Sequence, residues 1–231
     1  MAFSAEDIIW EDNHIIAVNK KAGQLVQADP SGDLALEDEL KTFIKNRDNK
    51  PGNVFLGVTH RIDRPVSGVV LFAKTSKALT RINALFKEGT IKKTYWAIVK
   101  NRPPAATELL VHYLVRDTNK NKTVAHLYTR NDAKEARLTY RVVGQSVNYV
   151  FLEIDLLTGR HHQIRCQLSK IGCPIKGDLK YGFPRSNPDG GICLHSRQLE
   201  FEHPVKKELV TINAPVPFDT LWGEFVKAIK P

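Results

Sequence analysis

The stretch that decides the fold is "HRIDRPVSGVVLFAK", residues 60–74. Its first half concentrates charge, because one carboxylate, Asp63, lies between Arg61 and Arg64, and His60 precedes them. Its second half contains an unbroken apolar run, residues 69–73, which is typical of a buried strand. Most surface ion pairs contribute little to stability, so the rest of the chain must show whether this charge has a function.

The segments around this stretch predict short strands interleaved with amphipathic helices. Ser76 is expected to cap a helix that Gly89 ends, and the polar residues 101–135 are expected to form only weak strands. The predicted helices are 33–47, 75–89, 160–172 and 218–230, and the clearer strands lie within 8–23, 69–73, 92–100, 136–144, 149–159, 192–201 and 208–215. Because most neighbouring strands resemble hairpins, the prediction is an α+β fold with a mixed, largely antiparallel central sheet flanked by helices.

Composition narrows the functional classes. The 231 residues carry a formal net charge of +9, which suits a polyanionic partner, either nucleic acid or an acidic membrane surface. The apolar runs are strand-sized, and the acidic start of the chain does not have the layout of a signal peptide. The three cysteines form no CxxC pair and are expected to be reduced thiols in a cytosolic protein.

A second charged cluster is "TGRHHQIRCQL", residues 158–168. On a helix, Arg165 would share a face with His161 and His162, and Thr158 is expected to cap that helix. The first-turn amides would then favour an anion, although a solvated basic helix face accounts for the pattern equally well. The nearby cysteines and histidines have no zinc-ligand spacing, so no metal site is predicted.

The chain contains no Ser-His-Asp arrangement in any familiar pattern, no glycine-rich phosphate loop and no GxGxxG fingerprint, which argues against the common hydrolases, kinases and dehydrogenases. An aspartate among cations stays ionised, so Asp63 is suited to act as a nucleophile or a base. The aromatic residues of the predicted strand 92–100 are of the type on which a flipped nucleobase stacks.

The motifs resemble those of the RluA-type pseudouridine synthases. Residues 60–74 match the His-Arg-Leu-Asp signature, and four further blocks occur in the family's order: "IAVNKKAGQLV", "KKTYWAIV", "TGRHHQIRCQLSKIGCPIKGDLKYG" and "LHSRQLEFEHP". The resemblance, with its five blocks in order, spans roughly residues 7 to 215. Four residues depart from the pattern, and they bear on how the substrate is held: Lys21 for proline, Val66 and His161 for threonine, and Gln167 for histidine.

The resemblance implies an enzyme that isomerises a uridine of ribosomal or transfer RNA to pseudouridine without a cofactor. It implies that Asp63 is the catalytic aspartate, that Tyr95 stacks on the target base and that Arg165 pairs with Asp63. The substrate-binding residues that it implies are Arg61, Arg64, His60, His162 and Gln163. It further implies a single catalytic domain of two subdomains over residues 1–231, with no S4-like RNA-binding domain, acting as a cytoplasmic monomer.

Three questions stay open from the sequence. A protein that binds RNA without catalysis is one alternative, and an RNA N-glycosylase or nuclease is another. The resemblance also leaves undecided which uridine is modified, and whether Asp63 attacks the sugar or takes a proton from it.

Overall fold

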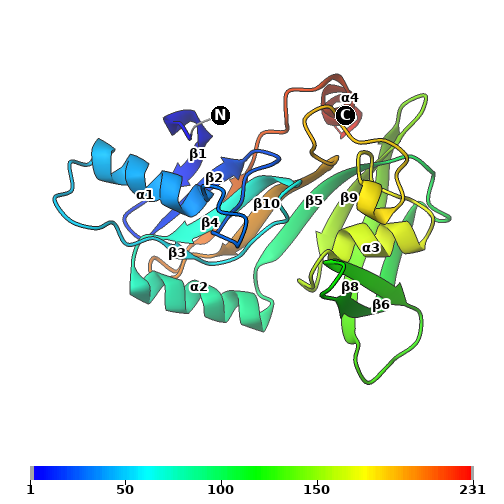
Figure 1. Cartoon of the computed structure of the whole chain (residues 1–231), viewed down its shortest axis with the longest axis horizontal. Coiled ribbons are helices and arrows are strands. Elements are labelled where there is room, and N and C mark those ends of the chain that lie inside the picture. The colour runs from blue at the N-terminus through cyan, green and yellow to red at the C-terminus, as the bar shows by residue number, and fades with distance from the viewer. Residues whose placement is uncertain (1–2, 230–231) are drawn as a thin grey trace. The chain divides into compact units, whose positions relative to one another are not determined.

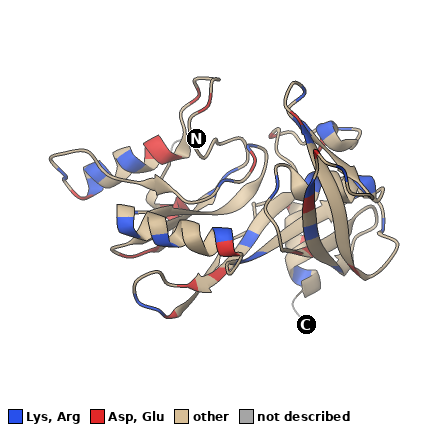
Figure 2. Ribbon diagram, turned by 90° about the horizontal axis from the view of Figure 1, so that it is seen from below, with Lys and Arg blue, Asp and Glu red and all other residues tan. Residues whose placement is uncertain are grey.

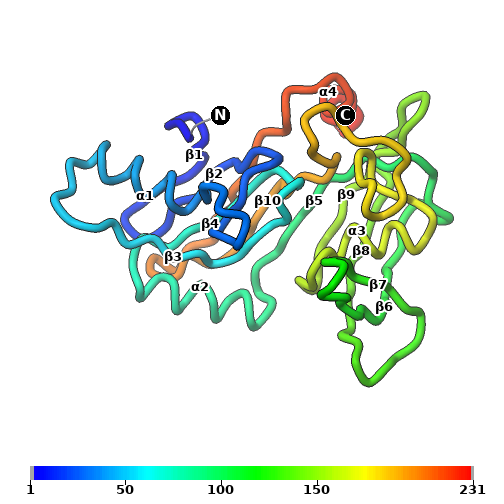
Figure 3. The backbone as a smooth tube through the Cα atoms, viewed as in Figure 1, coloured from blue at the N-terminus to red at the C-terminus, as the bar shows by residue number. Residues whose placement is uncertain are grey.

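The computed structural model describes residues 3–229, and the chain divides into two compact units. The first unit comprises the chain up to Ile91 together with Ser196–Pro215, and the second comprises Lys92–His195 with the segment from Val216 onward. Figure 1 labels the helices and strands of both units. Figure 3 traces the same chain as a tube, so that the return of the late segment 196–215 to the first unit can be followed.

The first unit is a sheet with two helices. Its strands run in the order β1–β2–β4–β10–β11, with β3 beside β4, and the ladders β1–β2, β2–β4, β3–β4 and β10–β11 are antiparallel. The elements are η1 (Ala5–Asp7), β1 (Ile8–Glu11), β2 (Ile15–Lys20), α1 (Leu36–Arg47), β3 (Gly57–Val58), β4 (Ser67–Ala73), α2 (Ser76–Glu88), β10 (Leu194–Glu202) and β11 (Leu209–Asn213).

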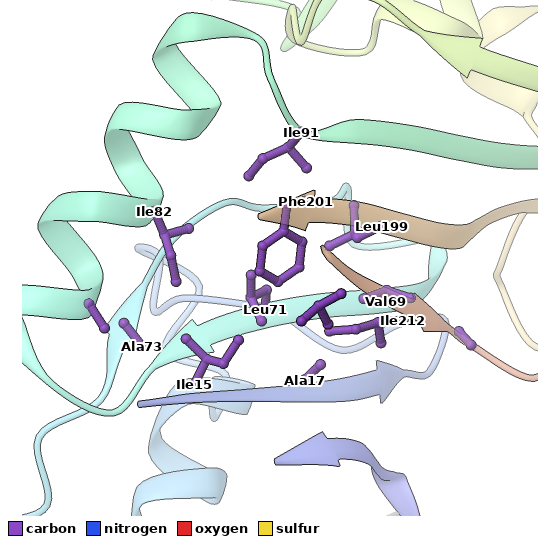
Figure 4. Packing of buried hydrophobic residues seen from close by; sticks show 13 residues of the cluster. Ile15, Ala17, Val69, Leu71, Ala73, Ile82, Ile91, Leu199, Phe201 and Ile212 are labelled. Carbon is purple, nitrogen blue, oxygen red and sulfur yellow. The ribbon is translucent and has the colours of Figure 1, made fainter. Parts of the chain in front are cut away.

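The strand β4 confirms the prediction of a buried strand after the charged motif, since all seven of its residues are buried. Val69, Leu71 and Ala73 belong to a core cluster that includes Ile82 of α2 and Phe201 of β10. Figure 4 shows these side chains converging between α2 and the strands. Because successive residues of a strand face opposite sides, Val70 and Phe72 are buried on the second face of the sheet.

The second unit is an antiparallel sheet in the order β5–β9–β8–β6–β7. The elements are β5 (Lys92–Val99), β6 (Thr107–Asp117), β7 (Lys122–His126), β8 (Lys134–Gln145), β9 (Val150–Leu156), α3 (Gln163–Lys170), η2 (Leu179–Tyr181) and α4 (Thr220–Ile229). The prediction of weak strands in residues 101–135 is wrong, because β6 has 11 residues and pairs with both β7 and β8. The alternation is weak in the sequence because exposed positions of this hairpin include the apolar Leu109, Val111 and Val124, whereas buried positions include the polar His112 and Thr123.

Three helix ends differ from the prediction. Thr75, not Ser76, caps α2, and its hydroxyl accepts the N–H of Ala78 at 3.2 Å. Thr158 does not cap α3, because that helix begins at Gln163 and His162 occupies the cap position with a left-handed φ of 51°. The closing helix is described from Thr220 to Ile229, and residue 230 of the predicted span lies outside the described residues.

The fold confirms the predicted hairpins, the end of α2 and the free cysteines. The antiparallel pairs β1–β2 and β8–β9 lie where hairpins were expected, and Gly89 ends α2 with a φ of 75°. The three cysteines are buried free thiols. In residues 3–229, no helix has both the length and the apolar character to cross a membrane.

Candidate active site

Asp63 lies in a turn that leads directly into β4. Its backbone C=O accepts the N–H of Val66 at 2.9 Å, and its side chain is half-buried. The next residue, Arg64, is held from two directions by the loop that follows β2: its C=O accepts the N–H of Gly23 at 2.8 Å, and its Nε donates to the Gly23 C=O at 3.0 Å. The loop therefore fixes the backbone on the C-terminal side of Asp63.

Lys20, at the end of β2, completes this clamp. Its side chain is only 1% exposed, and Nζ donates to the C=O groups of Lys21, Gln24 and Arg64 at 2.9, 2.8 and 3.0 Å. Burial lowers the pKa of Lys20 to about 7, and the charge of Asp63 acts in the opposite direction. Three carbonyl acceptors match the three N–H donors of an ammonium group, so these bonds, like the charge of Asp63, stabilise the charged form against the effect of burial.

The two arginines that flank Asp63 are directed elsewhere within this unit. Arg64 forms an ion pair with Asp33 at 2.7 Å, and Nη1 of the exposed Arg61 lies 3.4 Å from the side-chain oxygen of Gln27. Within this unit, Lys20 is therefore a cation near Asp63. The sequence did not predict Lys20 as a site residue.

His60 forms a hydrogen bond that supports the fold of the first unit. Its Nε2 accepts the N–H of Leu71 at 3.0 Å, and its ring lies 4.9 Å from the ring of Phe86 in α2. The hydroxyl of the preceding Thr59 donates to the C=O of Leu71 at 2.6 Å. These bonds hold the start of the charged motif alongside β4.

Tyr95 and Trp96 are successive residues of β5, and the strand register separates their side chains. Trp96 lies opposite Glu153, and its ring packs 4.7 Å from Phe225 of α4. Tyr95 lies opposite Ile154, which in turn lies opposite Tyr140 of β8.

The face that carries Tyr95 is the one on which α3 packs. Tyr140 and Ala136 share a face of β8, since they are an even number of residues apart. Ala136 packs in one cluster with Cys166 of α3. Tyr95 therefore belongs to the α3 face of this sheet and Trp96 to the α4 face, and both side chains are buried.

Arg165 of α3 forms a buried two-pronged ion pair with Asp178. Its Nε and Nη2 donate to the two carboxylate oxygens at 2.7 and 2.8 Å, and the two side chains are 5% and 1% exposed. The guanidinium also lies 5.0 Å from the ring centre of Tyr181. Two parallel bonds fix the plane of a guanidinium, so Asp178 determines how Arg165 is presented.

His162 and Tyr181 form a second buried connection beside this pair. The oxygen of Tyr181 accepts the N–H of Thr123 at 2.8 Å and forms a hydrogen bond with Nδ1 of His162 at 2.9 Å. Burial, followed by the charge of Arg165, lowers the pKa of His162 to about 2, so the imidazole is neutral.

Gln163 and His161 anchor the approach to α3. The side-chain oxygen of Gln163 accepts from the Thr158 hydroxyl and the Arg160 N–H at 2.8 and 3.0 Å, and its nitrogen donates to the Arg137 C=O at 3.0 Å. The His161 ring stacks on His162 at 3.8 Å, and its Nδ1 lies 2.8 Å from the Thr123 hydroxyl. Because His161 precedes the helix, the expected shared helical face of His161, His162 and Arg165 is wrong in that respect.

Lys20, Asp178 and Tyr181 were not among the residues predicted from the sequence. The signals were present, since Lys20 belongs to the "NKKAG" block and the other two to the "GDLKYG" block. Periodicity cannot find such residues, because a buried charge is defined by the partner that the fold supplies.

Each unit by itself therefore carries candidate groups for chemistry. The first unit presents a half-buried carboxylate on a fixed turn, and the second presents an oriented guanidinium and an aromatic residue. A carboxylate can act as a nucleophile or base, and an aromatic ring can stack on a base. Among residues 3–229, no group of three or more histidine, cysteine or acidic side chains could hold a metal ion.

Comparison with known proteins identifies the family. The model of the RNA pseudouridylate synthase family matches residues 14–170. An uncharacterized RNA pseudouridine synthase of Synechocystis sp. is 31% identical over 214 residues, and the ribosomal large subunit pseudouridine synthase C of Vibrio parahaemolyticus is 29% identical over 215. The matches cover 91% and 90% of this chain and 65% of each relative, so the chain spans just under two thirds of their length.

A solved structure shares the fold. The structure titled Human RNA Pseudouridylate Synthase Domain Containing 4 superposes with a TM-score of 0.78 at 23% identity, over 97% of this chain and 93% of that one. The match of the family model covers the charged motif at residues 60–74, β5 and the whole of α3. The chain belongs to the RNA pseudouridylate synthase family.

Proposed function

We propose that this chain is an RNA pseudouridine synthase that converts uridine to pseudouridine in ribosomal or transfer RNA, with Asp63 as its catalytic residue. The single observation that carries the proposal is the clamped turn within the family match, where Lys20 and Gly23 hold the backbone beside Asp63. The relative named as a ribosomal large subunit synthase favours ribosomal RNA as the first substrate to test.

The reaction conserves atoms overall. The C1′–N1 bond of the nucleoside breaks, the base turns, and a C1′–C5 bond forms, while a proton leaves C5 and another is gained at N1. No electron acceptor or transferred group is required, so no cofactor is proposed. Asp63 attacks the ribosyl unit or accepts a proton from it, and either role requires an ionised carboxylate.

The other residues are assigned to holding the substrate. Tyr95 stacks on the target base, and Arg165 keeps the carboxylate of Asp63 ionised and oriented. Arg61 and Arg64 contact the phosphates of the flipped nucleotide, which their exposure in the first unit supports.

The remaining assigned residues position other residues of the site. His60, His162 and Gln163 support substrate binding by positioning the segments that carry Asp63 and Arg165, as their bonds within each unit suggest. We place the enzyme in the cytoplasm, acting as a monomer whose two units serve as one catalytic domain. The free buried cysteines support a reducing compartment.

The test is to incubate the purified chain with ribosomal RNA and with transfer RNA that lack modifications, and to map pseudouridine by carbodiimide treatment. The wild type should modify a discrete uridine, and the mass of the RNA should not change. Asp63→Asn should make no product while RNA binding is retained, because an amide is nearly the same shape but is neither a nucleophile nor a base.

Asp132→Asn, at an exposed aspartate of the second unit, serves as the matched control and should retain turnover. Release of uracil or strand cleavage would assign the chain to the glycosylases or nucleases. Binding without product would favour a non-catalytic RNA-binding protein, and turnover of Asp63→Asn within ten-fold of wild type would remove Asp63 as the catalytic residue.

A further inference from the structure

The proposed function assigns no role to a group of cations in the second unit. Lys and Arg are spread over both units (Figure 2), and many of those in the first unit are neutralised by acidic neighbours. Arg116 of β6, Lys122 of β7 and Lys180 of η2 differ, since none of them forms an ion pair within residues 3–229.

These three cations converge on one corner of the unit. Lys180 Nζ donates to the C=O of Asn121 at 3.0 Å, in the β6–β7 turn. The neighbouring Lys122 places its Nζ 5.3 Å from the ring centre of Tyr181, the residue that follows Lys180. Arg116 lies opposite Thr123 in the β6–β7 ladder. Both Arg116 and Lys180 help to lower the pKa of His162, so their charges are felt at one imidazole.

Hydrogen bonds and core packing hold the segments that carry these cations. The Thr123 N–H donates to Tyr181, the Thr123 hydroxyl bonds to His161, and a core cluster joins Ala125 of β7 to Cys166 of α3. The turn end of the hairpin is thus tied to the helix that carries Arg165. Cations on a rigid base lose little freedom on binding, so they suit a repeated, fixed array of negative charges.

We propose that Arg116, Lys122 and Lys180 form a binding site for the backbone phosphates of RNA. This inference rests on the proposed function, since it places a second part of the substrate strand on the second unit. Asp117 lies opposite Lys122 in the ladder and accepts the N–H of Lys120, but it forms no ion pair with the three cations among the described residues. The cations therefore stay available to phosphate, and each phosphate contact releases bound counterions. Phosphate contacts position an RNA without reading its sequence, so this site would act on every substrate alike.

The test uses a fluorescein-labelled RNA hairpin with uridines in its loop, and measures the dissociation constant between about 50 and 200 mM salt. The site variant carries Arg116→Gln, Lys122→Gln and Lys180→Gln. The matched control carries Lys45→Gln, Lys77→Gln and Lys87→Gln, which are exposed helix residues of the first unit without an ion pair among the described residues. Both variants lose three positive charges.

The site variant should bind about ten-fold or more weakly near 150 mM salt, with a salt slope less steep by about 2 to 3. The control should stay within about two-fold of wild type. A conservative variant with Arg116→Lys, Lys122→Arg and Lys180→Arg should retain binding, which separates lost charge from lost folding.

Equal affinity of the site and control variants, or equal weakening in both, would overturn the site. This failure differs from failure of the proposed function. If the wild type makes no pseudouridine but binds RNA through these cations, the proposed activity is refuted and the phosphate site is retained. If the wild type is active but the site variant binds RNA as tightly as wild type, the phosphate site is refuted and the proposed activity is retained.

Discussion

The pair of Arg165 and Asp178 takes two opposite charges almost entirely out of water. Removing ions from water costs several kcal/mol each, and the two-pronged geometry offsets that cost only while both partners are present. Arg165 is therefore bound into the fold of its own unit as well as being a candidate catalytic residue. Variants of Arg165 must be judged on stability as well as on turnover.

Asp178→Asn should lower the free energy of unfolding by about 3–5 kcal/mol, because a buried guanidinium loses its two charged acceptors. Urea unfolding of the purified variant measures this directly. Asp132→Asn, which weakens the exposed pair of Arg130 and Asp132, should leave the midpoint unchanged. Equal midpoints for Asp178→Asn and wild type would mean that the buried pair contributes nothing.

His162 makes stability depend on pH in a definite direction. Its folded-state pKa is about 2, well below the ordinary value of 6.5, so below pH 6.5 the unfolded chain binds a proton that the folded chain does not. Stability from this group is present above pH 6.5 and declines as the pH falls, by up to about 1.4 kcal/mol per pH unit. His112 and His203, whose pKa values burial also lowers, act in the same direction.

His162→Gln should therefore show a shallower decline in unfolding free energy between pH 6.5 and 5 than wild type. Urea titrations at several pH values in this window give both slopes. Identical slopes for the two proteins would show that His162 is protonated in the folded state.

At the scale of elements, one glycine permits the close approach of β4 to β10. Gly68 has a φ of 114°, and a Cβ at this position would lie 2.2 Å from the backbone oxygen of Ser196 in β10. No side chain can move to relieve a contact with backbone. The close approach of β4 and β10 therefore depends on the residue five positions after Asp63.

Gly68→Ala should destabilise the protein by several kcal/mol, since positive φ costs an alanine about 1–2 kcal/mol and overpacking adds about 1–3. Thermal or urea unfolding provides the measurement. Gly89→Ala is the matched control, because Gly89 has a φ of 75° but open space around its Cβ position, and it should show only the smaller backbone cost. Similar losses in both variants would mean that the contact with Ser196 relaxes freely.

At the scale of the whole molecule, we expect the formal charge of +9 to govern how strongly the proposed RNA substrate is held. If six or more phosphates are contacted, the affinity should fall roughly a thousand-fold between about 50 and 200 mM salt, because each contact releases counterions. Titration of a labelled RNA at several salt concentrations gives the slope. A dissociation constant that does not change with salt would show that the excess charge is ordinary surface charge.

The sequence by itself determined most of the elements and the family. Alternation and helical spacing report which face of an element is buried, and residues 60–74 join a buried strand to a charged motif that is typical of this family. The hairpin β6–β7 was not predicted because apolar residues such as Leu109 and Val124 are exposed while the polar His112 is buried, which weakens the same signal.

Only the tertiary structure decided the partners of the charged groups. Lys20, Asp178 and Tyr181 look like ordinary polar residues in the sequence, yet three carbonyls surround the first and Arg165 contacts the other two. The tertiary structure also pairs Arg64 with Asp33. It determines that Tyr95 lies on the α3 face of its sheet and Trp96 on the α4 face. The physical reason is that periodicity records burial along one element, whereas an ion pair or a hydrogen bond depends on which distant segments the fold brings within about 3 Å.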